Sequence, residues 1–272
     1  MLKKVSVNGT TLTYLEQGAG PPVVLLHGAY SDHRIWESQR EAVAKSYRFI
    51  AIDLRYFGTA PWPDQGQHFN QETHVADIAA FIRELKIAPV HLVGRSYGAT
   101  TALAVGIRHP ELVLSLFLNE PGIASALTDS ADRQAAAEDR KCMAGVGEAV
   151  KAANNAEATK LFFECVNGQP GGFDALPAAA RAMHLDNART VPLQLKAASA
   201  IRITCADLAS IKKLVEITKG ELTRTYYQIT VGAVHRCMPG SRLTTISGGR
   251  HGSPSQQPAA FNDALLAFLA RH

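Results

Sequence analysis

The sequence predicts an α/β protein with a mostly parallel, doubly wound sheet and an inserted helical cap. Three observations support this fold class. Short apolar runs of strand type alternate with helical segments, first up to residue 118 and again from residue 214. One of these runs passes through a glycine-bounded turn into an alanine-rich helix. The intervening residues are helical in pattern and have no strand-type runs, so we expect a core of residues 1–122 and 211–272 and a cap of residues 123–210.

The elements before the cap follow from alternation, apolar runs and turn signals. Asn8-Gly9 is a strong hairpin signal between two alternating runs. A continuous apolar run, such as residues 23–26, is typical of a strand that is covered on both faces. The expected strands are residues 3–7, 10–16, 23–26, 47–52, 90–93 and 112–118, and the expected helices are 33–45, 70–85 and 99–108.

The strand pattern returns after the cap. We expect strands over residues 214–218 and 242–246 and a helix over residues 226–236. The loop 247–254 is rich in glycine, and the closing helix begins near Pro258, at a position that favours proline.

The segment from Gly94 to Gly98 reads G-x-S-x-G between the apolar strand and the helix. This context predicts a sharp, strained turn that displays the Ser96 hydroxyl as a nucleophile. A Cβ at Gly94 or Gly98 is expected to collide with the adjacent strand or helix. The helix that follows presents its N-terminus to negative charge that develops beside Ser96.

A serine nucleophile needs a base within hydrogen-bond reach, and histidine is the usual one. Of the ten histidines, His251 is favoured because it follows the last strand in a glycine-rich loop. The chain order serine, acid, histidine also fits this choice. His27 ends a strand as well, but it precedes the turn that is expected to form part of an oxyanion hole, and His184 lies in the cap.

Four motifs together resemble the α/β-hydrolase fold superfamily over nearly the whole chain. They are the strand and turn at Leu-Leu-His27-Gly28, the loop 53–58, the G-x-S-x-G turn and the histidine loop 249–253. The loop 53–58 resembles D-x-R-G-x-G, although Tyr56 replaces the first glycine. The resemblance implies a serine-nucleophile member of esterase or lactonase type. It does not imply a substrate, because this fold supports many chemistries.

The third catalytic member, the acid, has two candidates. In most of the family it is an Asp three residues after a glycine that ends the strand following the cap. Here that stretch is Gly220-Glu-Leu-Thr223, and threonine cannot carry the charge. Some lactonases and dehalogenases of the family place the acid after the strand that precedes the cap, which corresponds to Glu120. We therefore expect Glu120 to be the acid, with Glu221 as the alternative.

The oxyanion hole is expected to use backbone N–H groups. One belongs to Tyr97, the residue after the nucleophile, and the other to Ala29 or Tyr30 in the turn after His27-Gly28.

Aromatic residues of the loop after residue 55 and of the cap are candidates for a substrate pocket. Packing of cap against core is the simpler explanation for most of them. The candidate pocket residues are His27, Tyr56, Phe57, Trp62 and His184, together with Phe162, Phe163 and Met183.

Composition and charge exclude several function classes. The net charge is +4 with scattered basic residues, so we expect no nucleic-acid partner.

No apolar run approaches a membrane span, and the N-terminus does not resemble a signal peptide. Cys142, Cys165, Cys205 and Cys237 are far apart, which favours free thiols in a cytoplasmic protein. We expect no metal and no cofactor, a small-molecule substrate, and a monomer or homodimer.

These observations favour a serine hydrolase that cleaves a carboxylic ester or a lactone. Two alternatives remain open. One is a different chemistry on the same fold, either C–C bond hydrolysis or cofactor-free perhydrolase or haloperoxidase-like activity. The other is a receptor-like ligand-binding protein with little turnover.

Overall fold

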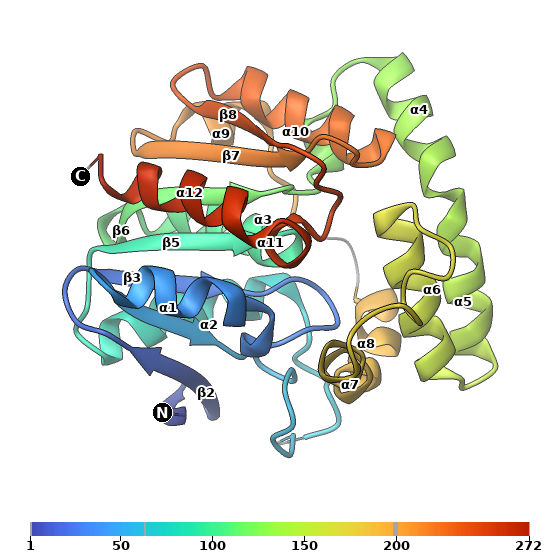
Figure 1. Ribbon diagram of the computed structural model, residues 1–272, viewed down its shortest axis with the longest axis horizontal. Coiled ribbons are helices and arrows are strands. Elements are labelled where there is room, and N and C mark those ends of the chain that lie inside the picture. Colours follow the sequence, from blue (N-terminus) through green and yellow to red (C-terminus); the bar gives the residue numbers. More distant parts are fainter. Residues whose placement is uncertain (1, 63, 198–200, 272) are drawn as a thin grey trace.

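An eight-stranded sheet lies at the centre of the structure, which is a computed structural model that describes residues 2–62, 64–197 and 201–271 (Figure 1). The strand order is β1-β2-β4-β3-β5-β6-β7-β8. β1 pairs antiparallel with β2, and β2 with β4, whereas the pairs from β4 to β8 are parallel. The strands are β1 Leu2–Val7, β2 Thr10–Gln17, β3 Pro22–Leu26, β4 Arg48–Ile52, β5 Val90–Arg95, β6 Val113–Asn119, β7 Leu214–Gly220 and β8 Arg242–Ile246. The predicted fold class is confirmed.

The apolar runs of the sequence form the central strands. β3 lies between β4 and β5, with Val24 paired to Ile50 on one side and to Leu92 on the other. These three side chains are fully buried, because helices cover both faces of the sheet. The carboxyl ends of β3, β5, β6, β7 and β8 meet along one edge, where ligand sites of such sheets form.

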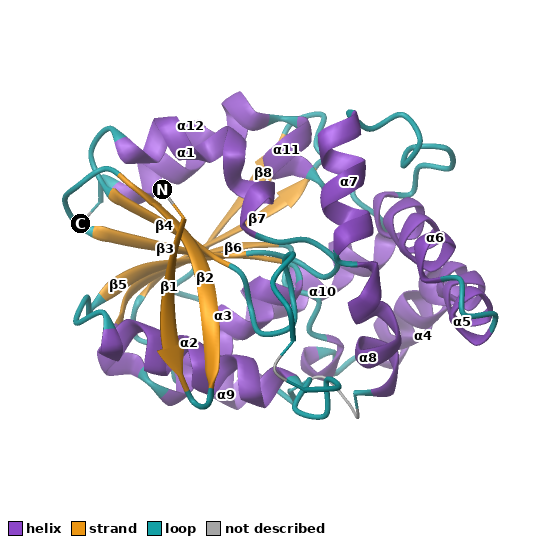
Figure 2. Ribbon diagram, turned by 90° about the horizontal axis from the view of Figure 1, so that it is seen from below, coloured by secondary structure: helices purple, strands orange, loops and turns teal. Residues whose placement is uncertain are grey.

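Two groups of helices cover the sheet, one on each face (Figure 2). One face carries α1 Glu37–Ala44, α11 Ser253–Gln256 and α12 Pro258–Leu269. The other carries α2 Gln71–Glu84, α3 Tyr97–Arg108, α9 Cys205–Ala209 and α10 Thr225–Cys237. No helix within the described ranges has the length and apolar character that crossing a bilayer requires.

The cap lies beyond the carboxyl ends of the strands (Figure 1). Its helices are α4 Ser130–Asp139, α5 Ala144–Lys151, α6 Asn155–Asn167, α7 Ala178–Asp186 and α8 Val191–Lys196. α9 belongs to the core, because it packs against α3 and α10 and its Leu208 is fully buried. The chain therefore returns to the core before residue 205, earlier than the expected boundary at residue 210.

The four cysteines form two disulfides, which corrects the expectation of free thiols. Cys142 pairs with Cys165 inside the cap, and Cys205 pairs with Cys237 between α9 and α10. The Cα–Cα distances are 5.6 Å and 5.0 Å. Separations of 23 and 32 residues gave no sequence signal, because only the folded chain brings these positions together. Since disulfides persist mainly in oxidising compartments, the cysteines no longer support a cytoplasmic location.

Reduction is expected to destabilise the protein. Closing a loop of this length restricts the unfolded chain and contributes about 3–4 kcal/mol per disulfide in the chain-entropy description. Thermal unfolding with and without dithiothreitol measures the effect, and the Cys205→Ala/Cys237→Ala variant isolates the pair that joins α9 to α10. Unfolding midpoints that do not respond to reduction or to this substitution would contradict the assignment.

Candidate active site

Ser96 stands at the turn between β5 and α3 in a backbone conformation that few serines adopt. Its φ and ψ are 52° and −115°, and its N–H donates to the Asn119 carbonyl at 2.8 Å. A Cβ at Gly94 would lie 2.5 Å from the Ala99 Cα, and one at Gly98 would overlap the carbonyl oxygens of β3. Both positions therefore require glycine, which confirms the steric reason for the motif. Positive φ at a non-glycine residue costs energy and is concentrated at functional sites.

Glu120 and His251 form a buried hydrogen-bonded pair. The distance from Glu120 Oε2 to His251 Nδ1 is 2.5 Å, and the two residues are 0% and 2% exposed. The other carboxylate oxygen, Oε1, accepts the Gly220 N–H at 2.7 Å. The structure thus brings together the acid and base that the sequence suggested, although they are 131 positions apart.

Thr223 occupies the position where most of the family has its acid, and it supports Glu120 instead. Its hydroxyl donates to Glu120 Oε2 at 2.9 Å. The side chain of Glu221, the alternative acid, has different hydrogen-bond partners. Its carboxylate is exposed and accepts the Ser247 hydroxyl and the Gly248 N–H. The arrangement therefore favours Glu120 over Glu221 as the partner of His251.

The strand ends fix the positions of this pair. Glu120 directly follows β6, has a φ of 47° and donates its N–H to the Thr218 carbonyl at 3.0 Å. The Asn119 side chain donates to the hydroxyls of Thr218 and Ser253, which links β6 to β7 and to the helix after the histidine loop. Gly220 lets that loop approach β7, because a Cβ there would overlap the Gly249 carbonyl.

Tyr227 of α10 stacks on the imidazole of His251. The ring centroids are 3.8 Å apart and the planes differ by 16°. Tyr227 and Ser96 also line the same outer cleft. One residue therefore lies beside both the nucleophile candidate and the base candidate. No sequence pattern predicts this role, because Tyr227 is one of several apolar-face residues of an ordinary helix.

Burial sets the protonation of His251. Desolvation lowers its pKa below the usual 6.5, the hydrogen bond and charge of Glu120 oppose this, and the Arg95 cation adds to the lowering. The imidazole is therefore neutral at pH 7. With Nδ1–H donating to Glu120, the other ring nitrogen, Nε2, carries the lone pair that a base needs.

The turn after β3 supplies the expected backbone amides. Gly28, Ala29 and Tyr30 line the same cavity as Ser96, and Tyr30 has a φ of 53°. Tyr97 is the first residue of α3, and the first N–H groups of a helix have no intrahelical carbonyl partner. Ala29 and Tyr97 also meet Ser96 in a second cavity. Both amide groups that the motif predicts thus lie beside the serine.

Two cavities meet at Ser96. The first is enclosed, has a volume of about 20 Å³ and contains His251 in its wall. Phe162, Phe163 and Val166 of α6 form its apolar side. The second is an outer cleft of about 580 Å³ that includes Tyr226, Tyr227 and Ile201. Of the expected pocket residues in the cap, His184 lies in the enclosed cavity, while Met183 lies outside both walls.

The other expected pocket residues lie outside the walls of both cavities, although Tyr56, Phe57 and Trp62 line a separate small pocket, so their role in binding substrate stays a prediction. His27 is fully buried and accepts the Leu54 N–H, so it connects the turn after β3 to the segment after β4. Phe57 packs against the His27 ring at 4.8 Å. The Trp62 indole N–H donates to the Tyr56 carbonyl, and the Tyr56 hydroxyl donates to a loop aspartate. The loop is held both by its own hydrogen bonds and by the cap, because Arg189 donates to the Gly58 and Ala60 carbonyls.

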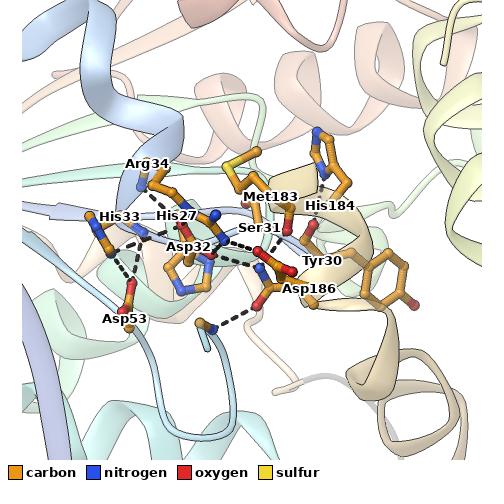
Figure 3. A network of polar contacts seen from close by, with 12 residues as sticks. His27, Tyr30, Ser31, Asp32, His33, Arg34, Asp53, Met183, His184 and Asp186 are labelled. Atoms are coloured by element: carbon orange, nitrogen blue, oxygen red, sulfur yellow. Dashed lines mark hydrogen bonds and ion pairs between the residues drawn. The ribbon is translucent and has the colours of Figure 1, made fainter. Parts of the chain in front are cut away.

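A polar network attaches the cap to the core beside this site (Figure 3). Arg34 donates to Asp32 and to Asp186 at the end of α7. The Tyr30 carbonyl lies 2.7 Å from His184 Nδ1, which therefore donates to it. Burial lowers the pKa of His184 to about 4, so this ring is neutral at pH 7. The cap is thereby connected to the oxyanion turn itself.

Part of this network has the residue types of a metal site. One ligand atom each from Asp32, His33 and Asp53 lies within 4.8 Å of the others. Each already has protein partners: Asp32 binds Arg34, and Asp53 accepts from both the N–H and the ring of His33. Arg55, two residues after Asp53, pairs with Asp77. We assign Asp32, which also accepts from Asn187 of the cap, to attachment of the cap, and the pair of His33 and Asp53 to the core.

Comparison with known proteins gives the same fold. A family model described as alpha/beta hydrolase fold matches residues 21–143. A 2-hydroxy-6-oxo-6-(2'-aminophenyl)hexa-2,4-dienoic acid hydrolase from Metapseudomonas resinovorans is 35% identical over 119 residues, 42% of this chain and 40% of the relative. An epoxide hydrolase from Caballeronia sordidicola is 32% identical over 42% of this chain and 35% of the relative. These matches span less than half of either relative.

The likeness in structure extends over the whole chain. An esterase from Exiguobacterium antarcticum superposes with a TM-score of 0.78 at 20% identity and covers 99% of this chain and 100% of its own. At that identity the likeness establishes the fold and leaves the chemistry to the residues of the site.

The two histidines next to carboxylates are expected to titrate in opposite directions. Burial lowers the pKa of His251, whereas the hydrogen bond and charge of Asp53 outweigh desolvation and raise the pKa of His33. A pH titration followed by NMR with ring-labelled histidine is expected to place His251 below 6.5 and His33 above 6.5. Assignments come from His251→Gln and His33→Gln, and the reverse order of the two values would contradict the description.

Proposed function

We propose that the chain is a serine hydrolase of the α/β-hydrolase fold that cleaves a carboxylic ester or lactone through an acyl-enzyme. The observation that carries the proposal is the buried hydrogen bond between Glu120 and His251 in the wall of the cavity that displays Ser96. A nucleophile, a neutral base and an orienting acid are the three parts of this mechanism.

In the first step the Ser96 oxygen attacks the carbonyl carbon of the substrate. His251 Nε2 takes the hydroxyl proton as the C–O bond forms, and the carbonyl oxygen becomes an oxyanion. Glu120 holds the ring in the tautomer with Nδ1–H and stabilises the imidazolium that results. Because the pair is buried, its attraction is screened less than it would be in water.

The oxyanion is stabilised by the backbone amides of Tyr97 and of Ala29 or Tyr30, which need no reorganisation when the charge develops. Collapse of the tetrahedral intermediate breaks the bond to the alcohol, which receives the proton from His251. Water then attacks the acyl-serine with His251 again as base, and release of the acid restores the Ser96 hydroxyl.

Tyr227 has two uses in this scheme. Its ring covers one face of His251, and an aromatic face attracts the cation that forms there during attack. It also lies beside Ser96 in the wall of the outer cleft, which limits the space open to the Ser96 side chain. Both effects position the reacting groups before substrate binds, which lowers the entropic part of the barrier.

C–C bond hydrolysis is a second candidate, because a relative named for a dienoic acid substrate is 35% identical over 119 residues. The same serine, histidine and acid serve either reaction, so the residues do not separate the two. Product analysis separates them, because an ester yields an alcohol and an acid whereas a C–C substrate yields a carbon-centred leaving group that acquires a proton.

Ser96→Ala is expected to abolish hydrolysis of an activated aryl ester. Removal of the nucleophile from such a triad costs about 10⁶-fold in kcat. The reaction is followed by release of 4-nitrophenolate, with the exposed Ser6→Ala variant as the matched control. Wild-type turnover in the Ser96 variant would exclude the mechanism. A wild-type protein that binds ester without hydrolysing it would favour a receptor.

Glu120→Gln and Glu221→Gln form a matched pair that tests the acid. The amide at position 120 no longer fixes the tautomer or stabilises the cation, so kcat is expected to fall by about 10⁴-fold. The amide at position 221 changes only an exposed turn, so kcat is expected to stay within about twofold of wild type. Circular dichroism checks that both variants fold. A large loss in the Glu221 variant alone would overturn the assignment of the acid.

A further inference from the structure

We propose that the enclosed cavity beside Ser96 is a subsite for a carboxylate group of the substrate, and that Arg95 is the residue that binds it. This inference rests on the proposed hydrolase function, and it narrows the substrate class to esters or lactones with a short acidic arm.

Arg95 is a buried cation without an ion-pair partner. It is 6% exposed, its Nε has no hydrogen-bond partner, and none of the ion pairs between described residues includes it. Glu120 is near enough to influence its pKa, but both oxygens of that carboxylate are occupied by Gly220, Thr223 and His251. A charge in this situation is costly to bury unless something pairs with it.

The position of Arg95 places its charge beside the reacting atoms. It directly precedes Ser96 at the end of β5, and its side chain lies in the wall of the enclosed cavity. Its Nη1 is 3.8 Å from the point that a Cβ on Gly28 would occupy, so the guanidinium lies against the oxyanion turn. An anion bound there is therefore close to the carbonyl group that Ser96 attacks.

The other polar side chains that line the cavity supply no negative charge to balance the Arg95 cation. The Thr159 hydroxyl donates to its own helix, and the Asn167 carbonyl oxygen accepts the Gly252 N–H. His184 is neutral at pH 7 because burial lowers its pKa to about 4. Among the described residues that line this cavity, none is Asp or Glu. A ligand carboxylate is thus the group that complements the cavity, and a guanidinium binds it through two parallel hydrogen bonds.

The sizes of the two cavities limit the length of the acidic arm. The enclosed cavity has a volume of about 20 Å³ and is closed by Phe162 and Phe163, so it admits only a small group such as a carboxylate. The outer cleft of about 580 Å³ accommodates the larger part of the substrate. Half-esters of short dicarboxylic acids match this division.

Two esters of similar size test the subsite: 4-nitrophenyl butyrate, which is neutral, and 4-nitrophenyl hemiglutarate, which carries a carboxylate. Arg95→Gln is expected to lower kcat/KM for the hemiglutarate by about 10- to 100-fold more than kcat/KM for the butyrate, the range for a lost charged hydrogen bond. Arg95→Lys keeps the charge but loses the geometry for two parallel hydrogen bonds. Its kcat/KM for the hemiglutarate is therefore expected to lie between those of the wild type and Arg95→Gln. Arg242→Gln removes the same charge from an exposed position at the start of β8 and is the control.

A binding measurement separates this inference from the proposed function. Calorimetry with glutarate on the Ser96→Ala protein needs no turnover, and the added Arg95→Gln change is expected to weaken binding at least tenfold. Equal losses for both esters, or glutarate binding that does not depend on Arg95, would overturn the subsite. Arg95-dependent glutarate binding without ester hydrolysis by the wild type would support the subsite and reject the hydrolase. If Arg95→Gln does not fold, the Arg95→Lys protein is used instead, and the ratio of kcat/KM for the hemiglutarate to that for the butyrate is compared with the wild-type ratio.

Discussion

A single carboxylate, that of Glu120, holds the site together. It is fully buried and accepts hydrogen bonds from a backbone amide of β7, from the Thr223 hydroxyl and from His251. Each donor comes from a different segment, so the carboxylate is tied to the end of β7, to the turn after it and to the loop after β8. Without these donors a buried carboxylate is unstable, and without the carboxylate the histidine has no fixed tautomer.

The sheet makes this convergence possible. Parallel strands bring their carboxyl ends to one edge, and β5, β6, β7 and β8 are neighbours in the order of the sheet. Ser96 and Glu120 both adopt positive φ directly after their strands, at the carboxyl edge of the sheet. The cost of these two conformations is offset by the packed core beneath them, whose central strands are fully buried. Glycine at positions 94, 98 and 220 permits the close contacts that result.

Much of this arrangement follows from the sequence, because local patterns specify it. The apolar runs predict the strands, and G-x-S-x-G between strand and helix predicts the turn at Ser96. Thr223 occupies the usual position of the acid, and a neutral side chain cannot replace a carboxylate. The sequence therefore favours Glu120, after the strand that precedes the cap, as the acid.

Other features depend on contacts between distant segments and leave no local signal. Tyr227 reaches the site because α10 packs beside the loop after β8, and the disulfides join cysteines that are 23 and 32 residues apart. The aromatic loop at Tyr56 and Trp62 resembles a pocket in composition, yet its hydrogen bonds are made within the loop and to the cap residue Arg189. Arg95 is visible in the motif, but only its burial and its missing partner distinguish it from an exposed basic residue.

The most direct test of the account is to trap the acyl-enzyme and locate it. Trypsin cleaves after Arg95 and releases a peptide of residues 96–108 whose first residue is Ser96 and which contains no other serine. After brief reaction with 4-nitrophenyl butyrate and acid quenching, tandem mass spectrometry is expected to place a butyryl group on Ser96, at up to one equivalent per chain. Hydrolysis of the ester with no adduct on this peptide, or with the adduct on another residue, would contradict the account.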